Sequence, residues 1–476
     1  MTLTPARVPV AGVRRLTATL YGYAFLDEFV LLYPVYALLF ADTGLSVWQM
    51  SSLFVLWSAT GVLLEVPSGA WADAVSRRAL LWLGPLLGAA GFALWVLVPS
   101  YWAFALGFVL WGARGALASG ALEALVYEEL ERLGAASRYA RIMGRAHAAG
   151  QAAAMTAMAL SGPVFAAYGY PAVGAASVLA CLLCAGVATR FPEHRGVGPG
   201  AAVAVGGGGG DGGGRGGGCD GGDQEGSGGG GRGRGRGGGD LGGSGRGSGD
   251  GEGGGHGSGA HGVGRGDGDA GGPSGGGDVG NGLGWVAVLR AGVGEARRDR
   301  SVRGALLLVP AVAAVWGALD EYTPLLARDT GVADATVPYL LVLIWAGVTA
   351  GSLLAGPAER LGRKGLAALL TASALALAVG AGAGTPAGIA LVAVAFGGFQ
   401  LATVLADVRL QQRIEGTGRA TLTSLAGLAT DLTTITVYAT YATALTPTDT
   451  HAGAFVLYTV PYLVTAGVLA LRRLRP

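Results

Sequence analysis

The chain has little charge and almost no lysine. Only 13% of its 476 residues are charged, whereas soluble domains carry roughly 25%. Lys364 is the only lysine, so arginine supplies nearly all of the positive charge. Hydrophobic residues make up 51% of the sequence, and its mean hydropathy is +0.48. This composition excludes an ordinary soluble globular domain, and the net charge of +2 says little about partners.

Cysteine and histidine are scarce as well. Cys181, Cys184 and Cys219 are too few for a disulfide framework, and the first two fall in an apolar segment where packing is the simplest role. The chain has five histidines and no paired His motif, so the ligand spacing of a metal site is missing. We therefore expect a protein that is not an enzyme and that uses no metal or cofactor.

Apolar runs long enough to cross a membrane occur on both sides of a glycine-rich middle. A bilayer core requires about 20 apolar residues per helix. Spans are predicted at 16–40, 47–69, 79–98, 102–125, 142–167, 171–190, 303–326, 335–357, 365–383, 387–406, 419–444 and 453–471. We expect an all-α membrane protein with 12 transmembrane helices in two pseudo-symmetric six-helix bundles, at 1–195 and 285–476.

Basic residues gather at alternate ends of these spans. They occur at both termini and in the loops after the second, fourth, sixth, eighth and tenth spans. The set comprises Arg7, Arg14, Arg15, Arg77, Arg78, Arg132, Arg138, Arg141, Arg190, Arg195, Arg360, Arg363, Lys364, Arg409, Arg413, Arg419, Arg472, Arg473 and Arg475. Arg328 is the exception in the other loops. The positive-inside rule predicts a multi-pass protein of the plasma (inner) membrane with both termini and the central linker cytoplasmic.

The middle of the chain differs from both bundles. Residues 196–284 are roughly half glycine and cannot bury enough apolar surface to become ordered. A coil of this kind spans about 50 Å, so it can join two bundles without constraining either. Residues 231–237 alternate Gly with Arg, but acidic residues outnumber arginines in the segment and no aromatic is interleaved for base stacking. We predict a disordered, dispensable linker and no nucleic-acid partner.

An internal repeat relates the two bundles. The Asp-Thr-Gly of 42–44 recurs as 329–331, and the turn at 69–78 recurs as 355–364. The same offset aligns Arg114 with Gln400. The Leu-Asp-Glu of 26–28 also recurs, at 319–321, but about six residues out of this register. We treat that last recurrence as a possible coincidence.

Residues 69–78 resemble the signature of the major facilitator superfamily. The signature is Gly-x-x-x-Asp-x-x-Gly-Arg-Lys/Arg, and the match fails only at Ser76, which replaces the second glycine. The copy at 355–364 departs at Ala355 and Glu359 and keeps its final Gly-Arg-Lys. The runs 65–69 and 123–128 are similar to those of a 12-helix bacterial subset that is drug-efflux-like or uncharacterised. The resemblance covers the chain apart from the linker and implies a secondary transporter.

The two signature loops predict a gate on the cytoplasmic side. Gly69 allows two helix backbones to approach closely, and Asp73 can accept hydrogen bonds from a helix amino terminus. Arg77 or Arg78 can pair with a carboxylate across the seam between bundles. In the alternative interpretation, these charges only lie in solvent. The predicted gate residues are Glu65, Gly69, Asp73, Arg77, Arg78, Glu123, Glu128, Glu359, Arg363 and Lys364.

Ionisable residues in the middle of spans are candidates for a proton or substrate cavity, because they are costly in hydrocarbon. Asp27 lies near the middle of the first span, and Glu28 points about 100° away from it around the helix. Arg114 lies near the middle of the fourth span and resembles the superfamily's helix-4 arginine. The alternative for Arg114 is a structural ion pair with Asp27 or Glu28. Its counterpart Gln400 is uncharged, so proton chemistry is expected in the amino half.

The carboxy half has its own polar positions. Asp431 lies within the eleventh span among Thr430, Thr433, Thr434 and Thr436. It is interpreted either as a cavity residue or as a structural aspartate satisfied by these threonines. Asp320 and Glu321 lie nearer the outer end of the seventh span and are expected at most to line its mouth.

The fifth span bears on the direction of transport. Superfamily antiporters carry a Gly-x-x-x-Gly-Pro-x-x-Gly-Gly pattern there, and this chain keeps Gly162-Pro163 while losing three of the glycines. We predict proton-coupled efflux of a small drug-like or metabolite molecule by alternating access, in a monomer whose partners are substrate, protons and the lipid bilayer. Uptake by symport is the alternative, and a non-transporting membrane sensor or scaffold is a more remote one.

Overall fold

The computed structural model of the chain describes the backbone of residues 10–74, 76–118, 121–192, 300–413, 419–445 and 450–471. Side chains are described throughout these ranges except at 10, 65–74, 300–301 and 419–421. Within these ranges the chain consists of helices joined by turns. The predicted linker, 196–284, lies outside the described residues. We use "amino half" for residues 10–192 and "carboxy half" for residues 300–471.

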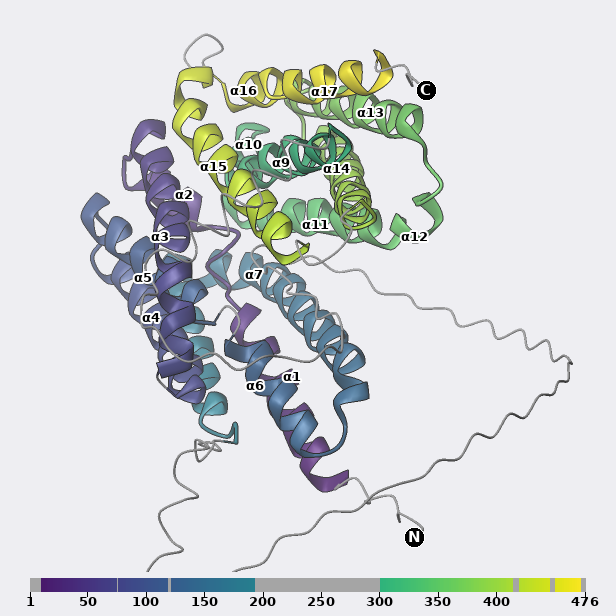
Figure 1. Ribbon diagram of the computed structural model, residues 1–476. Coiled ribbons are helices and arrows are strands. Elements are labelled where there is room, and N and C mark those ends of the chain that lie inside the picture. The colour runs from purple at the N-terminus through teal and green to yellow at the C-terminus, as the bar shows by residue number, and fades with distance from the viewer. Residues whose placement is uncertain are drawn as a thin grey trace, which may run out of the picture. The chain divides into compact units, whose positions relative to one another are not determined.

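The helices follow one another in each half with short connections (Figure 1). The amino half contains α1 (Val10–Glu28), α2 (Tyr36–Asp42), α3 (Val47–Ala74), α4 (Arg77–Leu97), α5 (Tyr101–Ala118), α6 (Ala121–Arg132), a 3₁₀ turn η1 (Ala136–Arg138) and α7 (Tyr139–Ala188). The carboxy half contains α9 (Arg300–Asp320), α10 (Thr323–Asp329), η2 (Asp334–Thr336), α11 (Val337–Leu353), α12 (Ala355–Ala358), α13 (Arg363–Gly382), α14 (Gly388–Gln411), α15 (Arg419–Leu445), α16 (His451–Leu457) and α17 (Val460–Leu471).

The described helices fit the twelve predicted spans. Nine of them are long and apolar enough to cross a membrane. One of these, α7, holds two spans, because Gly169 adopts φ 69° and ψ −165° and kinks it between the predicted fifth and sixth spans. The first span falls outside the nine because α1 contains Arg14, Arg15, Asp27 and Glu28. α15 supplies the remaining span.

The first and seventh spans are broken, where the sequence predicted continuous helices. α1 ends at Glu28 and α2 begins at Tyr36, while α9 ends at Asp320 and α10 begins at Thr323. Pro34 and Pro324 lie at these breaks, and proline has no N–H to continue a helical hydrogen-bond ladder. α2 and α10 are both seven residues long and end at Asp42 and Asp329.

The two breaks change the interpretation of the repeated Leu-Asp-Glu. Residues 26–28 end α1, and residues 319–321 end α9 and begin the turn that follows. Both copies therefore lie at the break of their span, and this shared position argues against the possible coincidence. The shift in register arises from the longer turn in the first span.

Glycine sets the closest helix packing in the carboxy half. A Cβ on Gly347 would lie 2.2 Å from the carbonyl oxygen of Ala393, and one on Gly351 would lie 2.0 Å from that of Gly397. Small residues four apart on both helices thus bring α11 and α14 into backbone contact. In the same half, α13 and α17 run side by side (Figure 1).

Among the described residues, the two halves contact each other mainly along two helix pairs, α3 with α15 and α7 with α11, and also where α2 meets α10. Between α3 and α15, the Phe54 ring lies 5.4 Å from that of Tyr438, and the hydroxyl of Ser51 on α3 lies 2.8 Å from that of Tyr322 in the turn between α9 and α10. Near the second pair, a Cβ on Gly162 of α7 would lie 2.7 Å from the carbonyl oxygen of Ala335 in η2, directly before α11. The glycine that the sequence aligned with an antiporter pattern therefore lies at a contact between halves.

Candidate functional site

A buried ion pair occupies the middle of the amino half. Nη2 of Arg114, on α5, lies 2.5 Å from Oδ1 of Asp27, at the end of α1. The same nitrogen donates to the backbone carbonyl of Asp27 at 2.7 Å. The Arg114 side chain is 6% exposed and that of Asp27 is 26% exposed. The arginine is thus buried in protein, while its carboxylate partner is partly exposed.

The break in the first span makes this geometry possible. Because α1 stops at Glu28, the Asp27 carbonyl has no helical partner further along and is available to Arg114. The Arg114 side chain therefore binds both the Asp27 carboxylate and the backbone carbonyl at the end of α1. Of the two roles that the sequence left open for Arg114, the ion pair with Asp27 is present.

Two cysteines and a glycine surround the pair. Nη1 of Arg114 lies 3.9 Å from Sγ of Cys181, and Sγ of Cys184 lies 3.8 Å from Oδ1 of Asp27. A Cβ on Gly88 of α4 would lie 3.0 Å from Nη1 of Arg114. The sequence predicted packing for these cysteines, and both are buried. Their contact with the pair was missed, because their apolar surroundings gave no signal of a charge.

Glu28 takes a different direction from Asp27, as the helical angle predicted. It packs against α7, where a Cβ on Gly150 would lie 3.2 Å from Cγ of Glu28. Glu28 follows Asp27 directly at the end of α1, so a second carboxylate lies next to the pair without joining it.

The carboxy-half counterpart of Arg114 is satisfied locally. Gln400 is buried on α14, and its Nε2 donates to Oγ of Ser352 on α11 at 3.0 Å. An uncharged hydrogen bond thus replaces the ion pair, and the two halves are asymmetric, as the sequence predicted.

Asp431 lies half-buried on α15. The hydroxyls of Thr430, Thr433 and Thr436 donate to carbonyls one turn earlier on the same helix, at 2.9, 2.7 and 2.8 Å. Each of these hydroxyls therefore has a carbonyl acceptor on its own helix. The cavity role and the structural role of Asp431 both stay predictions.

Glu321 makes a contact that the sequence did not predict. Its Oε2 accepts a hydrogen bond from the hydroxyl of Tyr36, on α2 in the other half. Asp320 and Glu321 are half-buried at the break of the seventh span, as Asp27 and Glu28 are at that of the first. The repeated Leu-Asp-Glu was the available signal, and only its register argued against it.

Three aromatic rings form a wall close to Arg114 along α5. The ring of Tyr33 stacks on that of Trp111 with centroids 5.1 Å apart, and the centroids of the Trp57 and Trp111 rings are also 5.1 Å apart. All three side chains are half-buried. Flat apolar faces one turn from a buried arginine suit an amphipathic or planar molecule better than a densely hydroxylated one.

A charged cluster joins the halves at the end formed by α2 and α10. Arg328 lies 2.6 Å from Asp42 of the other half and 3.1 Å from Asp334 of its own. The hydroxyl of Tyr170 donates to Asp42 at 2.6 Å. Arg328 was the one basic residue that broke the loop-charge pattern. We call Asp42, Tyr170, Arg328 and Asp334 the α2–α10 cluster.

The predicted cytoplasmic gate is described in part. Arg77 lies 2.5 Å from Glu128, with side chains 25% and 63% exposed. The sequence predicted such a pair across the seam, but this one joins α4 to α6 within the amino half. Exposed pairs of this kind contribute about 0–1 kcal/mol. Of the other predicted gate residues, Arg78 and Glu123 are half-buried, and Glu359, Arg363 and Lys364 are exposed. The side chains of Glu65, Gly69 and Asp73 lie outside the described residues.

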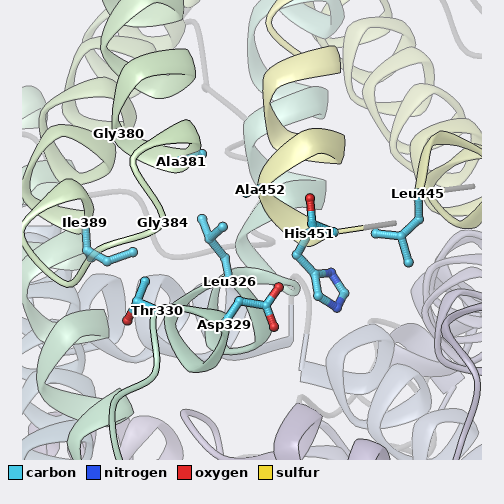
Figure 2. Close-up of a pocket in the computed structure, with 11 residues that line it drawn as sticks. Leu326, Asp329, Thr330, Gly380, Ala381, Gly384, Ile389, Leu445, His451 and Ala452 are labelled. Carbon is cyan, nitrogen blue, oxygen red and sulfur yellow. The ribbon is translucent and has the colours of Figure 1, made fainter. Parts of the chain in front are cut away.

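A separate pocket of about 470 Å³ lies in the carboxy half (Figure 2). Asp329 reaches it from the end of α10, and His451 from the start of α16. None of the residues described as lining it belongs to the amino half, so it does not include the Asp27–Arg114 pair. We place the candidate site at the Asp27–Arg114 pair, because a buried charge requires a functional or structural partner. The pocket in the carboxy half includes neither residue of this pair.

Repeated halves of six spans, with ionisable groups at mid-span and polar contacts between halves, define a multi-pass membrane transporter. A profile of the Major Facilitator Superfamily matches residues 17–437. The chain belongs to the Major Facilitator Superfamily. The resemblance in its signature loops and the 12-helix fold class are thereby confirmed.

Solved structures agree on the fold. A mutant of the nucleoside transporter NupG superposes with a TM-score of 0.65 at 10% identity, over 96% of this chain and 99% of that chain. The D-xylose-proton symporter gives a TM-score of 0.55 at 13% identity, over 96% of each chain. At such identities the likeness shows the fold alone. A comparison with curated proteins gave no match.

Gly88→Ala is expected to impair transport much more than Gly84→Ala. The added methyl at 88 would lie 3.0 Å from Nη1 and 3.1 Å from Cδ of Arg114, so the Arg114 side chain must shift by a few tenths of an ångström, which disturbs its short contacts with Asp27. At 84 the nearest atoms are 3.6 Å away, an ordinary contact. Both changes add the same methyl group to the same helix. Transport rates of the two variants in proteoliposomes check this, and equal rates would contradict a positioned Arg114.

Proposed function

We propose that this chain is a proton-coupled secondary transporter that exports a small amphipathic molecule across the plasma membrane by alternating access. The observation that carries the proposal is the Asp27–Arg114 pair, buried on the arginine side and partly open on the carboxylate side. A carboxylate in that position can exchange a proton with a water-filled cavity, while its arginine partner stays fixed.

The pair links protonation to conformation in a simple way. With Asp27 ionised, opposite charges 2.5 Å apart attract strongly in a medium of low dielectric constant. Protonation removes that attraction and leaves the buried Arg114 without a counter-ion, which is costly. The halves can relieve this by rocking so that Arg114 meets a substrate group or water. Such rocking of two bundles around a mid-membrane site is the basis of alternating access.

Export is favoured over uptake by two features. Gly162 of the antiporter-like run lies where α7 meets α11, and the aromatic wall of Tyr33, Trp57 and Trp111 suits an apolar or planar substrate. Uptake by symport is the second candidate, because the D-xylose-proton symporter shares the fold. We further propose a monomer with both termini and the linker in the cytoplasm, on the loop-charge pattern, and no nucleic-acid partner.

Purified protein in proteoliposomes with an imposed pH gradient tests this function. A ligand is first found by screening compounds for thermal stabilisation of the purified chain. An antiporter is expected to concentrate that ligand in the acidic compartment, because protons leaving that compartment drive substrate into it. A symporter would concentrate it in the alkaline compartment. Absence of any flux of a stabilising ligand would support the non-transporting alternative and overturn the proposal.

A further inference from the structure

A second pocket, of about 320 Å³, lies at the opposite end of the carboxy half from the α2–α10 cluster. It lies among the beginnings of α9 and α13 and the ends of α14 and α17. Helix ends of this kind place a pocket at the boundary between membrane and water. The Asp27–Arg114 pair involves none of its residues, and Arg363 is also one of the predicted gate residues.

Three arginines converge on this pocket. Arg363 comes from the first turn of α13, Arg409 from the last turn of α14, and Arg413 from just beyond α14. Arg409 is anchored, because its Nη2 donates to the Leu361 carbonyl at 2.5 Å. No acidic residue is among the described residues that line the space. Like charges at close range repel, so an anion between Arg363 and Arg409 would stabilise this arrangement.

The backbone adds to the positive potential. α13 begins after Gly362, which lines the pocket, and no side chain caps the first amide groups of this 20-residue helix. Uncapped amides at a helix start are donors for an anion. They supplement the three guanidinium groups and do not form a site by themselves.

The other wall of the pocket is apolar. Leu308 of α9 and Leu469 of α17 line it. Next to Leu469, α17 carries a stripe of exposed apolar side chains, with Val464 at 59%, Val468 at 45% and Leu471 at 81% exposure. In a membrane-spanning helix such a stripe faces lipid tails. The pocket thus combines a cationic end with an apolar path into the bilayer.

We propose that this pocket binds the headgroup phosphate of an anionic phospholipid, with an acyl chain along the exposed stripe of α17. Arg363, Arg409 and the start of α13 hold the phosphate, and Leu308 and Leu469 contact the first carbons of the chain. Basic pockets between helix ends at the membrane surface bind anionic headgroups in this manner. A zwitterionic lipid binds more weakly, because its own ammonium group is repelled by these arginines.

Native mass spectrometry of the purified full chain tests the site, with phosphatidylglycerol as the probe and phosphatidylcholine as its comparison. The parent is expected to retain phosphatidylglycerol preferentially, and Arg363→Gln is expected to weaken that binding about fivefold, the effect of one surface arginine. Arg360→Gln is the matched control, because Arg360 is exposed in the same loop and does not line the pocket. Arg409→Lys keeps the charge and is expected to bind better than Arg409→Gln.

Thermal stability in the presence of each lipid gives a second readout that does not depend on transport. A rise in melting temperature with phosphatidylglycerol, lost in Arg363→Gln and kept in Arg360→Gln, supports the site. Equal retention of the two lipids, or equal loss in both variants, would overturn it. Inorganic phosphate that stabilises the parent as strongly as phosphatidylglycerol would assign the pocket to a free anion and overturn the lipid proposal.

Discussion

Asp27→Asn is expected to reduce proton-driven accumulation of substrate to the level of protein-free vesicles, while substrate exchange at equal pH continues. Asparagine keeps the shape of the side chain and one hydrogen-bond acceptor but cannot titrate. The Asp27 carbonyl, 2.7 Å from Arg114, still holds the guanidinium in place. Gradient-driven accumulation and counterflow in proteoliposomes separate the two activities.

Glu28→Gln is the matched control, because it removes the adjacent carboxylate from the same helix end. It is expected to have a milder effect, since Glu28 packs against Gly150 and does not pair with Arg114. If Asp27→Asn still drives accumulation and Glu28→Gln does not, the proton site is Glu28. Survival of coupling in both variants would move the search to Asp431 and Glu321, the latter because it contacts the opposite half.

Arg328→Gln is expected to open the α2–α10 end of the transporter. Arg328 pairs with Asp42 of one half and Asp334 of the other, so its loss leaves two carboxylates facing each other across the seam. The side chains are about one-third exposed, which weakens each contact. A change of about 1–2 kcal/mol, or roughly fivefold to thirtyfold in the ratio of closed to open states, is expected.

Spin labels at Trp48→Cys and Tyr339→Cys report this opening, because both positions are exposed and belong to opposite halves. Cys219→Ser is added to each labelled variant, so that the only other cysteines are the buried Cys181 and Cys184. The distance distribution between labels is expected to shift to longer values in Arg328→Gln. Adding Asp42→Asn should reverse part of the shift by removing the repulsion. Arg303→Gln, an exposed arginine at the other end of the bundle, should leave the distribution unchanged. The same distribution in all variants would contradict a gating role.

Local chemistry was enough to predict the spans and the family. A membrane helix needs only its own apolar length and its own hydrogen bonds, so hydropathy locates it without reference to neighbours. Features that depend only on depth or angle within one helix were predictable in the same way. They are the arginine of the fourth span, its uncharged counterpart Gln400, and the different directions of Asp27 and Glu28 around their helix.

Contacts between residues of different helices could be identified only from the folded structure. Whether Arg114 meets Asp27 or Glu28 depends on where α1 stops, and the break was hidden because each proline was read as part of a continuous apolar run. The contacts of Tyr36 with Glu321 and of Asp42 with Arg328 join residues nearly 300 positions apart in the chain. Such pairings follow from how helices dock side by side. This docking depends on close backbone contacts at glycines such as Gly162 and Gly351. Hydropathy does not predict which neighbouring helix each glycine packs against.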